Sequence, residues 1–299
     1  INSVAKRFET DYPEEFRCLY MKECSESGRN ALKEKRVITS YLAGKNNGAV
    51  ILSEDEGTSV LLNGEDHVRI QVLCNGMDIQ SCFKKANEID DYIDAHFDYA
   101  FDEKYGYKTT FPTNTGTGMK AGYTLHLPSL SDARRLNDIS AELGRFGLKF
   151  RTVYGDGQNG YGNLYQISTQ KTLGQDEREV IKDLDDIVLQ IVNQEKEQRE
   201  HFYKKDKIQM DDEIYKSYGV LKYARKLSLK DSMVLISELM TGVSLGVLQF
   251  AHNGRYNINE LIMDIQPAVL RQNSGKAMSV AETDVLRAEY IRKYLPEII

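Results

Sequence analysis

The chain has 299 residues and a formal net charge of −6 at pH 7, with 41% hydrophobic and 28% charged residues. This composition is close to that of folded proteins, so a wholly disordered chain is excluded, and the length suits one large domain or two ordinary ones. No block of five or six like charges occurs, which argues against a nucleic-acid-binding surface. No apolar run approaches the roughly 18 residues of a membrane span.

The cysteines indicate the compartment. Four are present, without a C-x-x-C pair or a zinc-binding spacing: Cys18, Cys24, Cys74 and Cys82. A chain of this size needs no disulfide, so we expect a reducing, cytoplasmic location. The chain opens with Ile1 rather than Met, and we expect the natural protein to extend upstream. The first residues have helical spacing rather than the long apolar stretch of a signal peptide.

The first part of the chain predicts an antiparallel sheet flanked by helices. Apolar residues at helical spacing indicate a helix over residues 1–8 and another over residues 80–98. Short apolar runs between turn signals indicate three strands: residues 49–52, 59–62 and 67–73. The turn dipeptide Asn63-Gly64 precedes the third strand.

The third predicted strand carries charged residues. Val68 and Ile70 alternate with His67 and Arg69, so we expect Glu65, His67 and Arg69 to share one polar face of the sheet. Charged residues on a sheet face are usually solvated, and this pattern alone does not identify a site.

The middle of the chain mixes loop, strand and helix signals. Residues 106–122 contain four glycines and five threonines and predict a loop, whose successive amides could hold an anion. Further strands are predicted at residues 123–127, 148–154 and 163–168. Helices are predicted at residues 129–145 and 175–202.

From about residue 204 onward the signals are helical. Helices are predicted at residues 211–227, 229–240, 257–263 and 279–294. Two begin with a capping-box pattern, Ser228 with Asp231 and Ser279 with Glu282. The change in character predicts an α+β domain over residues 1–203, followed by a small all-helical domain over residues 204–299.

Residues 155–160, GDGQNG, match the G-x-G-x-x-G dinucleotide fingerprint in letters only. That fingerprint must open a helix, whereas the residues that follow here continue as a strand. A Rossmann site is therefore not predicted. The sequence also lacks a P-loop lysine, an HExxH motif and a GxSxG motif, and we predict no protein-held metal site.

Two segments gain meaning together. Residues 63–70 read NGEDHVRI, and residues 112–121 read PTNTGTGMKA. They resemble the N-E-E-D-H-[LV]-R-[IV] strand and the C-P-T-N-x-G-T-G-x-R loop of the phosphagen (ATP:guanido) kinase superfamily. Residues 161–174, YGNLYQISTQKTLG, are similar to the LGNLFQISNQxTLG segment of the bacterial protein arginine kinases within that superfamily. The resemblance covers about residues 29–294 and implies a phosphagen-kinase-like catalytic domain.

The resemblance implies transfer of the γ-phosphoryl group of magnesium-bound ATP to an arginine of a protein. This chemistry needs carboxylates that align and deprotonate the guanidinium, and cations that meet the phosphate charge. By resemblance, Glu65 is the base and Asp156 is the second guanidinium-binding carboxylate, in a loop that closes on substrate. The resemblance assigns these residues to ATP: Arg69, Lys120, Arg151, His67, Asn114 and Gly116.

Four positions depart from the family pattern. Phe111 replaces a reactive cysteine, Gly64 replaces the first glutamate, Lys120 replaces an arginine, and Asp156 replaces a glutamate. Lysine keeps the charge but lacks the forked donor geometry, so we expect weaker ATP binding rather than none. The family's upstream R-x-R-x-A-R-N motif is absent, and we attribute this to residues that precede Ile1 in the natural protein.

The predicted helical domain carries a further candidate site. Residues 283–288, TDVLRA, resemble the R-D-x-x-R-A motif that forms an allosteric phosphoarginine-binding pocket in the family. Asp284 and Arg287 are three residues apart, so both can point to one side of a helix. Thr283 replaces the first arginine. The alternative interpretation is a simple ion pair on the helix surface.

Three hypotheses follow. The first is a cytoplasmic, homodimeric protein arginine kinase that marks client proteins for a Clp-type protease with the help of an activator protein. The second is a non-catalytic relative that binds phosphoarginine as an adaptor, which Phe111, Gly64 and Lys120 favour. A kinase of small guanidino compounds is the third. Glu65, Arg69 and Arg151 favour an enzyme.

Overall fold

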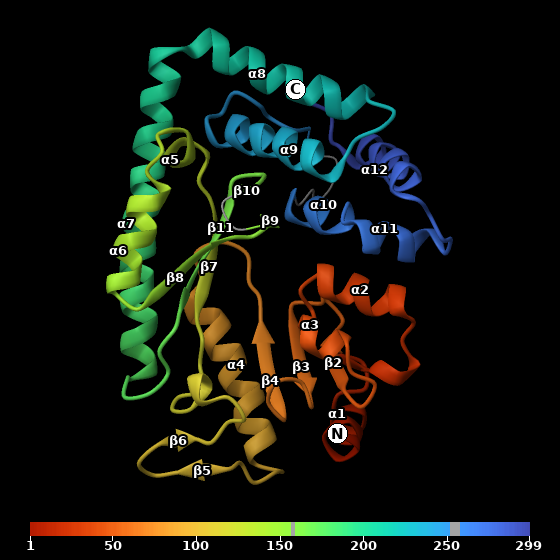
Figure 1. The fold of residues 1–299 in the computed structure, drawn as a ribbon, viewed down its shortest axis with the longest axis vertical. Helices are drawn as coiled ribbons and strands as arrows, with labels where there is room; N and C mark the ends of the chain where they lie inside the picture. Colours follow the sequence, from red (N-terminus) through yellow and green to blue (C-terminus); the bar gives the residue numbers. More distant parts are fainter. Residues whose placement is uncertain (157–158, 252–257) are drawn as a thin grey trace. The chain divides into compact units, whose positions relative to one another are not determined.

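A computed structural model describes residues 1–156, 159–251 and 258–299, and the side chains of residues 156 and 159 are not described (Figure 1). The chain forms two compact units. Residues 1–121 and 169–185 form the first, and residues 122–168 and 186–299 form the second. These units follow contacts in space, and the division by sequence character at residue 204 remains a prediction.

The first unit is built on a four-stranded antiparallel sheet with the strand order β1-β2-β3-β4. The strands are β1 (Phe16–Tyr20), β2 (Ala49–Ser53), β3 (Thr58–Leu62) and β4 (Val68–Val72). The three predicted strands are confirmed as β2, β3 and β4, and β1 is an addition. β2 and β3 are buried at every position, because they are the central strands and both faces of the sheet are covered.

Helices flank this sheet, as predicted. They are α1 (Asn2–Asp11), α2 (Glu26–Glu34), α3 (Ser40–Ala43) and α4 (Ile79–Asp94). Ile51 and Val60 pack with Phe8 of α1 and Ile93 of α4 in one core cluster. Alternate residues of the same strands pack in a second cluster against the segment that carries α3; this cluster includes Val50, Leu52, Leu61, Ile38 and Leu42. The sheet is therefore held between two apolar layers of the first unit.

The predicted loop of residues 106–122 lies in the first unit up to Ala121 and has little regular structure. Two short strands, β5 (Phe101–Asp102) and β6 (Gly106–Tyr107), form a hairpin, and β6 is the start of the loop. One 3-10 turn follows, η2 (Pro112–Asn114). Asp90 of α4 accepts hydrogen bonds from the hydroxyls of Tyr99 (2.9 Å) and Tyr107 (3.1 Å). These bonds attach the start of the loop to a core helix.

The second unit contains a three-stranded sheet with the order β7-β11-β8. Its strands are β7 (Gly122–His126), β8 (Leu148–Thr152) and β11 (Leu164–Thr169), close to the predicted ranges. The predicted single helix over residues 129–145 is wrong, because two helices occur, α5 (Pro128–Asp132) and α6 (Leu136–Arg145). Arg134 between them has a φ of 57°, which a continuous right-handed helix does not allow.

The rest of the second unit is helical, as predicted. Its helices are α7 (Glu177–Lys205, which begins in the first unit), α8 (Lys207–Tyr223), α9 (Leu229–Ser244), α10 (Ile258–Asp264), α11 (Pro267–Ser274) and α12 (Val280–Tyr294). Residue 257, the predicted start of α10, lies outside the described residues. The capping box of Ser279 and Glu282 is present. α11 was not predicted, although Pro267 at its first turn and Gly275 after its end, with a φ of 66°, are typical helix boundaries.

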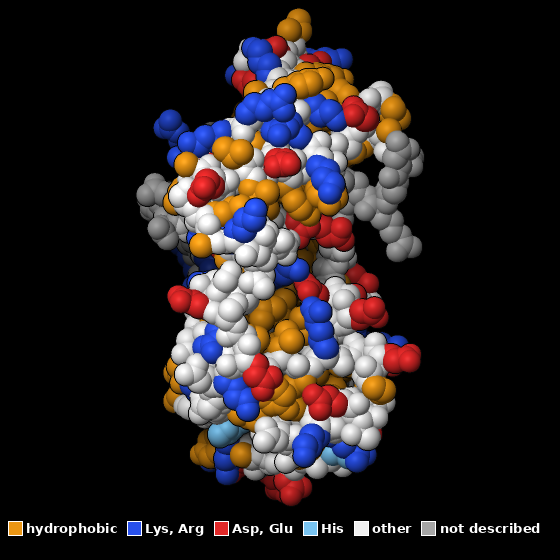
Figure 2. Space-filling model, turned by 90° about the vertical axis from the view of Figure 1, so that its right-hand side faces the viewer, with side chains coloured by type: hydrophobic (Ala, Val, Ile, Leu, Met, Phe, Trp, Pro, Cys, Tyr) orange, Lys and Arg blue, Asp and Glu red, His pale blue; other side chains and the backbone are white. Residues whose placement is uncertain are grey.

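The core of the second unit joins the sheet to the helices. Leu164 of β11 packs in one cluster with Ile214 of α8, Ile236 of α9 and Ile291 of α12. On the face drawn in Figure 2, basic and acidic side chains are interspersed with hydrophobic ones. No helix in the described ranges is long and apolar enough to cross a bilayer.

Candidate active site

Glu65 lies in a tight turn between β3 and β4. The amide of Asn63, which has a φ of 57°, donates to the carbonyl of His67 at 2.8 Å and closes the turn. β4 therefore begins at Val68, and the prediction that Glu65 and His67 share a strand face with Arg69 is wrong. Glu65 is half-buried, and its Oε2 accepts a hydrogen bond from the hydroxyl of Thr39 at 2.9 Å.

Arg69 lies in β4, three residues from the Glu65 turn along the chain. Its side chain is exposed, and it makes no hydrogen bond or ion pair with the described residues. His67 is exposed as well. Position 64 is open, since a Cβ added to Gly64 would meet nothing within 4 Å. A Cβ at position 64 would therefore meet no steric clash.

Asp66 connects the Glu65 turn to the glycine-threonine loop. Its carboxylate accepts hydrogen bonds from the amide of Thr110 at 2.8 Å and from Nδ2 of Asn114 at 2.7 Å. Oδ1 of Asn114 in turn accepts a hydrogen bond from Nζ of Lys120 at 2.5 Å. This chain of contacts holds Asn114 and Lys120 beside the turn that carries Glu65. Asp66 lies within the NGEDHVRI motif, but no role was predicted for it.

Thr172, in the second chain segment of the first unit (residues 169–185), holds the same loop by hydrogen bonds. Its carbonyl accepts a hydrogen bond from the amide of Thr117 at 2.9 Å, and its hydroxyl donates to the carbonyl of Thr115 at 2.6 Å. Gly116 has a φ of 115°, and a Cβ there would lie 2.2 Å from the carbonyl oxygen of Thr172. Only glycine fits at this position, so Gly116 is required for the backbone conformation of the loop.

Arg151 and Asp156 belong to the second unit. Arg151 is an exposed residue of β8, and its Nε donates to Oε1 of Gln166 in β11 at 2.7 Å. Gln166 thus orients the guanidinium along the sheet. Asp156 lies in the short strand β9 (Gly155–Asp156), which pairs with β10 (Asn159–Gly160). The side chain of Asp156 lies outside the described part of the structure.

The GDGQNG segment forms no nucleotide-binding turn in its described residues. β9 and β10 pair as antiparallel strands, and the chain continues through Tyr161 into β11. A dinucleotide fingerprint would open a helix at this point. The prediction that the chain continues from this segment as a strand is confirmed by β11.

Asp284 and Arg287 form an ion pair on α12, with 2.6 Å between Oδ1 and Nη1. The arginine side chain is only 2% exposed, so the alternative of a surface ion pair is wrong. Its Nε donates to the carbonyl of Ile265 at 2.9 Å, and its Nη1 donates to the carbonyl of Leu227 at 2.9 Å. Arg287 therefore binds the α8–α9 connection at Leu227 and the α10–α11 connection at Ile265. Thr283, at the position of the missing arginine, accepts a hydrogen bond from Nε of Arg271 at 3.1 Å.

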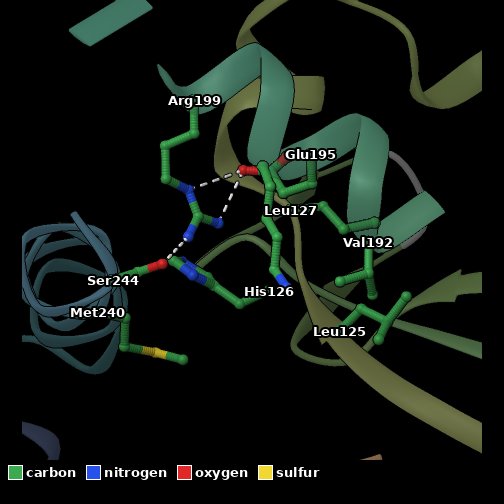
Figure 3. A pocket seen from close by; sticks show the side chains of 9 residues that line it. Leu125, His126, Leu127, Val192, Glu195, Arg199, Met240 and Ser244 are labelled. Carbon is green, nitrogen blue, oxygen red and sulfur yellow. Dashed lines mark hydrogen bonds and ion pairs between the residues drawn. The ribbon is translucent and has the colours of Figure 1, made fainter. Parts of the chain in front are cut away.

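A cavity of about 260 Å³ lies within the second unit between β7, α7 and α9 (Figure 3). Arg199 pairs there with Glu195 at 2.8 Å and also donates to Ser244. Glu195 accepts hydrogen bonds from the amides of Ser129 (3.1 Å) and Leu130 (2.9 Å) at the start of α5. These charges satisfy one another and the helix end, so we interpret the group as structural.

His126 lines the same cavity, and its Nε2 lies 2.8 Å from the hydroxyl of Ser237 on α9. Burial, together with the positive charge of Arg199, lowers the pKa of His126 to about 3. The imidazole is therefore neutral near pH 7. In the described ranges, no group of three or more His, Cys, Asp or Glu side chains could hold a metal ion.

Two family models match the chain. The model of the "ATP:guanido phosphotransferase, C-terminal catalytic domain" matches residues 1–198, and the model of the "Protein-arginine kinase McsB C-terminal domain" matches residues 207–298. A protein-arginine kinase of Bacillus pumilus is 39% identical over 280 residues, which cover 94% of this chain and 77% of that protein. A protein-arginine kinase of Bacillus subtilis is 37% identical over 301 residues, which cover 98% of this chain and 82% of that protein.

Solved structures agree in fold. A lombricine kinase superposes with a TM-score of 0.55 at 18% identity, over 65% of this chain and 58% of its own. A duplicated taurocyamine kinase of Schistosoma mansoni, with bound transition-state analogue components, gives a TM-score of 0.57 at 19% identity. This match covers 65% of this chain and 28% of the taurocyamine kinase chain. The matches span less than two thirds of either neighbour, and at this identity they establish the fold alone. The family models and the relatives from Bacillus show that the chain belongs to the ATP:guanido phosphotransferase family, in its protein-arginine kinase branch.

Proposed function

We propose that this chain transfers the γ-phosphoryl group of ATP to arginine side chains of proteins. The observation that carries the proposal is the polar connection in the first unit: Asp66 links the turn of Glu65 to Asn114, and Asn114 binds Lys120. A carboxylate and a cation from two distant parts of the sequence are thereby held on one framework. Family membership supplies the reaction class to which this framework is suited.

Each residue has a defined task in the proposed reaction. Glu65 aligns the guanidinium and receives the proton that it loses. The guanidinium nitrogen forms a bond to the γ-phosphorus, while the bond to the bridging oxygen breaks and its electron pair leaves with ADP. Arg69, Lys120 and Arg151 would offset the phosphate charge, because fixed cations stabilise a charged transition state without reorganisation. ATP would enter as its magnesium complex, with the metal held by the phosphates.

Glu65 is suited to the role of base by its two oxygen atoms. Oε2 is engaged by Thr39, whereas Oε1 accepts no hydrogen bond from residues in the described ranges. A carboxylate held at one oxygen and open at the other can meet a guanidinium edge. For the second carboxylate, Asp156, the assignment rests on the resemblance alone.

The wider setting is part of the proposal. Proteins with exposed arginines would be the substrates, with a Clp-type protease and an activator protein as partners, and the protein would act as a cytoplasmic homodimer. The adaptor alternative has weaker support, because the guanidinium of Arg287 is buried and engaged with two carbonyls and Asp284. A phosphoarginine site at Asp284 and Arg287 would require those bonds to open.

Incubation of the full-length protein with ATP and an unstructured, arginine-rich protein tests this function. We expect acid-labile phosphoarginine on the protein substrate, detected by mass spectrometry under neutral conditions, and little product from free arginine or other small guanidines. Preferential phosphorylation of a small guanidine would favour the third hypothesis instead.

A further inference from the structure

We propose that Thr39 is a positioning residue for Glu65, acting through the hydrogen bond from its hydroxyl to the carboxylate. The inference rests on the proposed function, in which Glu65 is the base. It concerns a residue outside both sequence motifs, 26 positions before the glutamate that it contacts.

The hydrogen of the Thr39 hydroxyl has a defined direction. Thr39 is the N-cap of α3, and its Oγ1 accepts a hydrogen bond from the amide of Leu42 at 3.2 Å. An oxygen that accepts from the helix end directs its own hydrogen elsewhere, and Oε2 of Glu65 lies 2.9 Å away. The cap therefore orients the donor toward the carboxylate.

The position of Thr39 is set by the core. Ile38 before it and Leu42 after it are 3% and 0% exposed and belong to one cluster with Leu61 of β3. Leu61 is four residues from Glu65 in the chain. Movement of the hydroxyl would disturb buried side chains on both sides, so the donor is anchored more firmly than one on a surface loop.

The same short segment also holds the backbone of the Glu65 turn. Nζ of Lys45 donates to the carbonyls of Asn63 and Gly64, both at 3.2 Å, and lies 4.4 Å from the ring centre of Tyr41. Nδ2 of Asn63 donates to the carbonyl of Asn47 at 2.8 Å. Residues 39–47 thus position both the main chain and the carboxylate of the base.

This arrangement has a chemical consequence. A glutamate side chain has three rotatable bonds, and a base is effective only in the orientation that meets the transferred proton. The Thr39 hydroxyl restricts Oε2, and Oε1 is then presented in one direction. Loss of the hydroxyl should therefore lower kcat and leave the KM for ATP nearly unchanged, because no phosphate contact is removed.

The test compares Thr39→Val with Thr39→Ser in the full-length protein. Removing one donor to a positioned carboxylate should lower kcat for arginine phosphorylation roughly 10- to 100-fold, the scale of a charge-assisted hydrogen bond. Serine keeps the hydroxyl and should retain kcat within about twofold. Thr39→Ala serves in place of valine if the branched residue does not fold.

Two controls separate positioning from loss of a helix cap. Ser25 caps α2 in the same unit by accepting a hydrogen bond from the amide of Gly28 at 3.1 Å, and within the described residues it makes no hydrogen bond with Glu65. Ser25→Ala should therefore leave kcat unchanged. In a Glu65→Gln background, Thr39→Val should cause no further loss, because residues that act through one group are non-additive.

Several results would overturn the proposal. They are an unchanged kcat in Thr39→Val, an equal loss in Thr39→Ser, or an equal further loss in the Glu65→Gln background. Wild type that forms no phosphoarginine at all would refute the proposed function, and the inference with it. Active wild type with an insensitive Thr39 would refute the inference alone.

Discussion

At the scale of single residues, Asp66 connects two parts of the proposed site. Its carboxylate receives donors from Thr110 and Asn114, and the second of these orients Lys120. Lysine carries a compact charge on a flexible side chain, so neighbouring groups must orient its ammonium group. In the proposed site, Asn114 would supply that orientation to Lys120.

Asp66→Asn should weaken ATP binding. An amide group replaces one acceptor oxygen by a donor, which would face either the Thr110 amide or the Asn114 amide group. With Lys120 released from its position, we expect roughly tenfold lower affinity for a non-hydrolysable ATP analogue in calorimetric titration. Asp91→Asn, at an exposed position of α4, is the matched control for the change of charge. Equal affinity in wild type and Asp66→Asn would show that the Asp66 contacts do not support the nucleotide.

At the scale of elements, the strongest sequence patterns corresponded to real helices and strands. Continuous apolar runs and alternation located β2, β3 and β4, and helical spacing located α4, α7, α8, α9 and α12. Single backbone conformations were harder to predict. The φ of Arg134 divides α5 from α6, and the turn closed by Asn63 removes Glu65 from the strand. Such angles depend on tertiary contacts, which periodicity does not report.

The candidate site was predictable in part. The motifs proposed Glu65, Arg69, Asn114 and Lys120 as site residues, and the structure brings the Glu65 turn and the Asn114–Lys120 pair together through Asp66. Thr39 and Thr172 carry no pattern of their own, because a lone threonine is common in any sequence. Their roles follow only from contacts between residues far apart in the chain.

Arg287 links α12 to the carbonyls of Ile265 and Leu227. Arg287→Met keeps the aliphatic stem but leaves Asp284 and the carbonyls of Ile265 and Leu227 without their donor. Breaking a buried ion pair from one side typically costs about 3–5 kcal/mol, so urea unfolding should show a loss of that order. Arg225→Met, at an exposed position, should change little. A stable Arg287→Met that has lost binding of free phosphoarginine would instead support the allosteric pocket.

At the scale of the whole molecule, the catalytic-domain match ends at residue 198 within α7, and the C-terminal-domain match begins at residue 207, where α8 starts. Helices α8, α9, α10 and α12 share a core with β11. The buried group of His126, Glu195 and Arg199 adds polar contacts between β7, α5, α7 and α9. Charged and titratable groups in such a position make stability depend on pH.

His126 should make the protein less stable in mild acid. Its pKa is lowered to about 3 in the folded state, against about 6.5 in an unfolded chain, so the unfolded state binds more protons between these values. The free energy of unfolding should therefore fall as the pH decreases from 6.5 toward 3, by up to about 2 kcal/mol at pH 5. His126→Asn should lose this part of the dependence in urea titrations at pH 7 and 5, whereas His201→Asn, at an exposed position of α7, should retain it. The same pH dependence in wild type and His126→Asn would contradict the assignment.

The most direct test of the central claim, that Glu65 is the base of a protein-arginine kinase, is phosphoarginine formation by the full-length wild type and by Glu65→Gln. Glutamine keeps the size of the side chain and can still accept the Thr39 hydrogen bond, but it cannot take up a proton. We expect the wild type to phosphorylate arginines of an unstructured protein, and Glu65→Gln to be slower by about 10²–10⁴-fold with an unchanged melting temperature. Comparable rates in the two proteins would contradict the account.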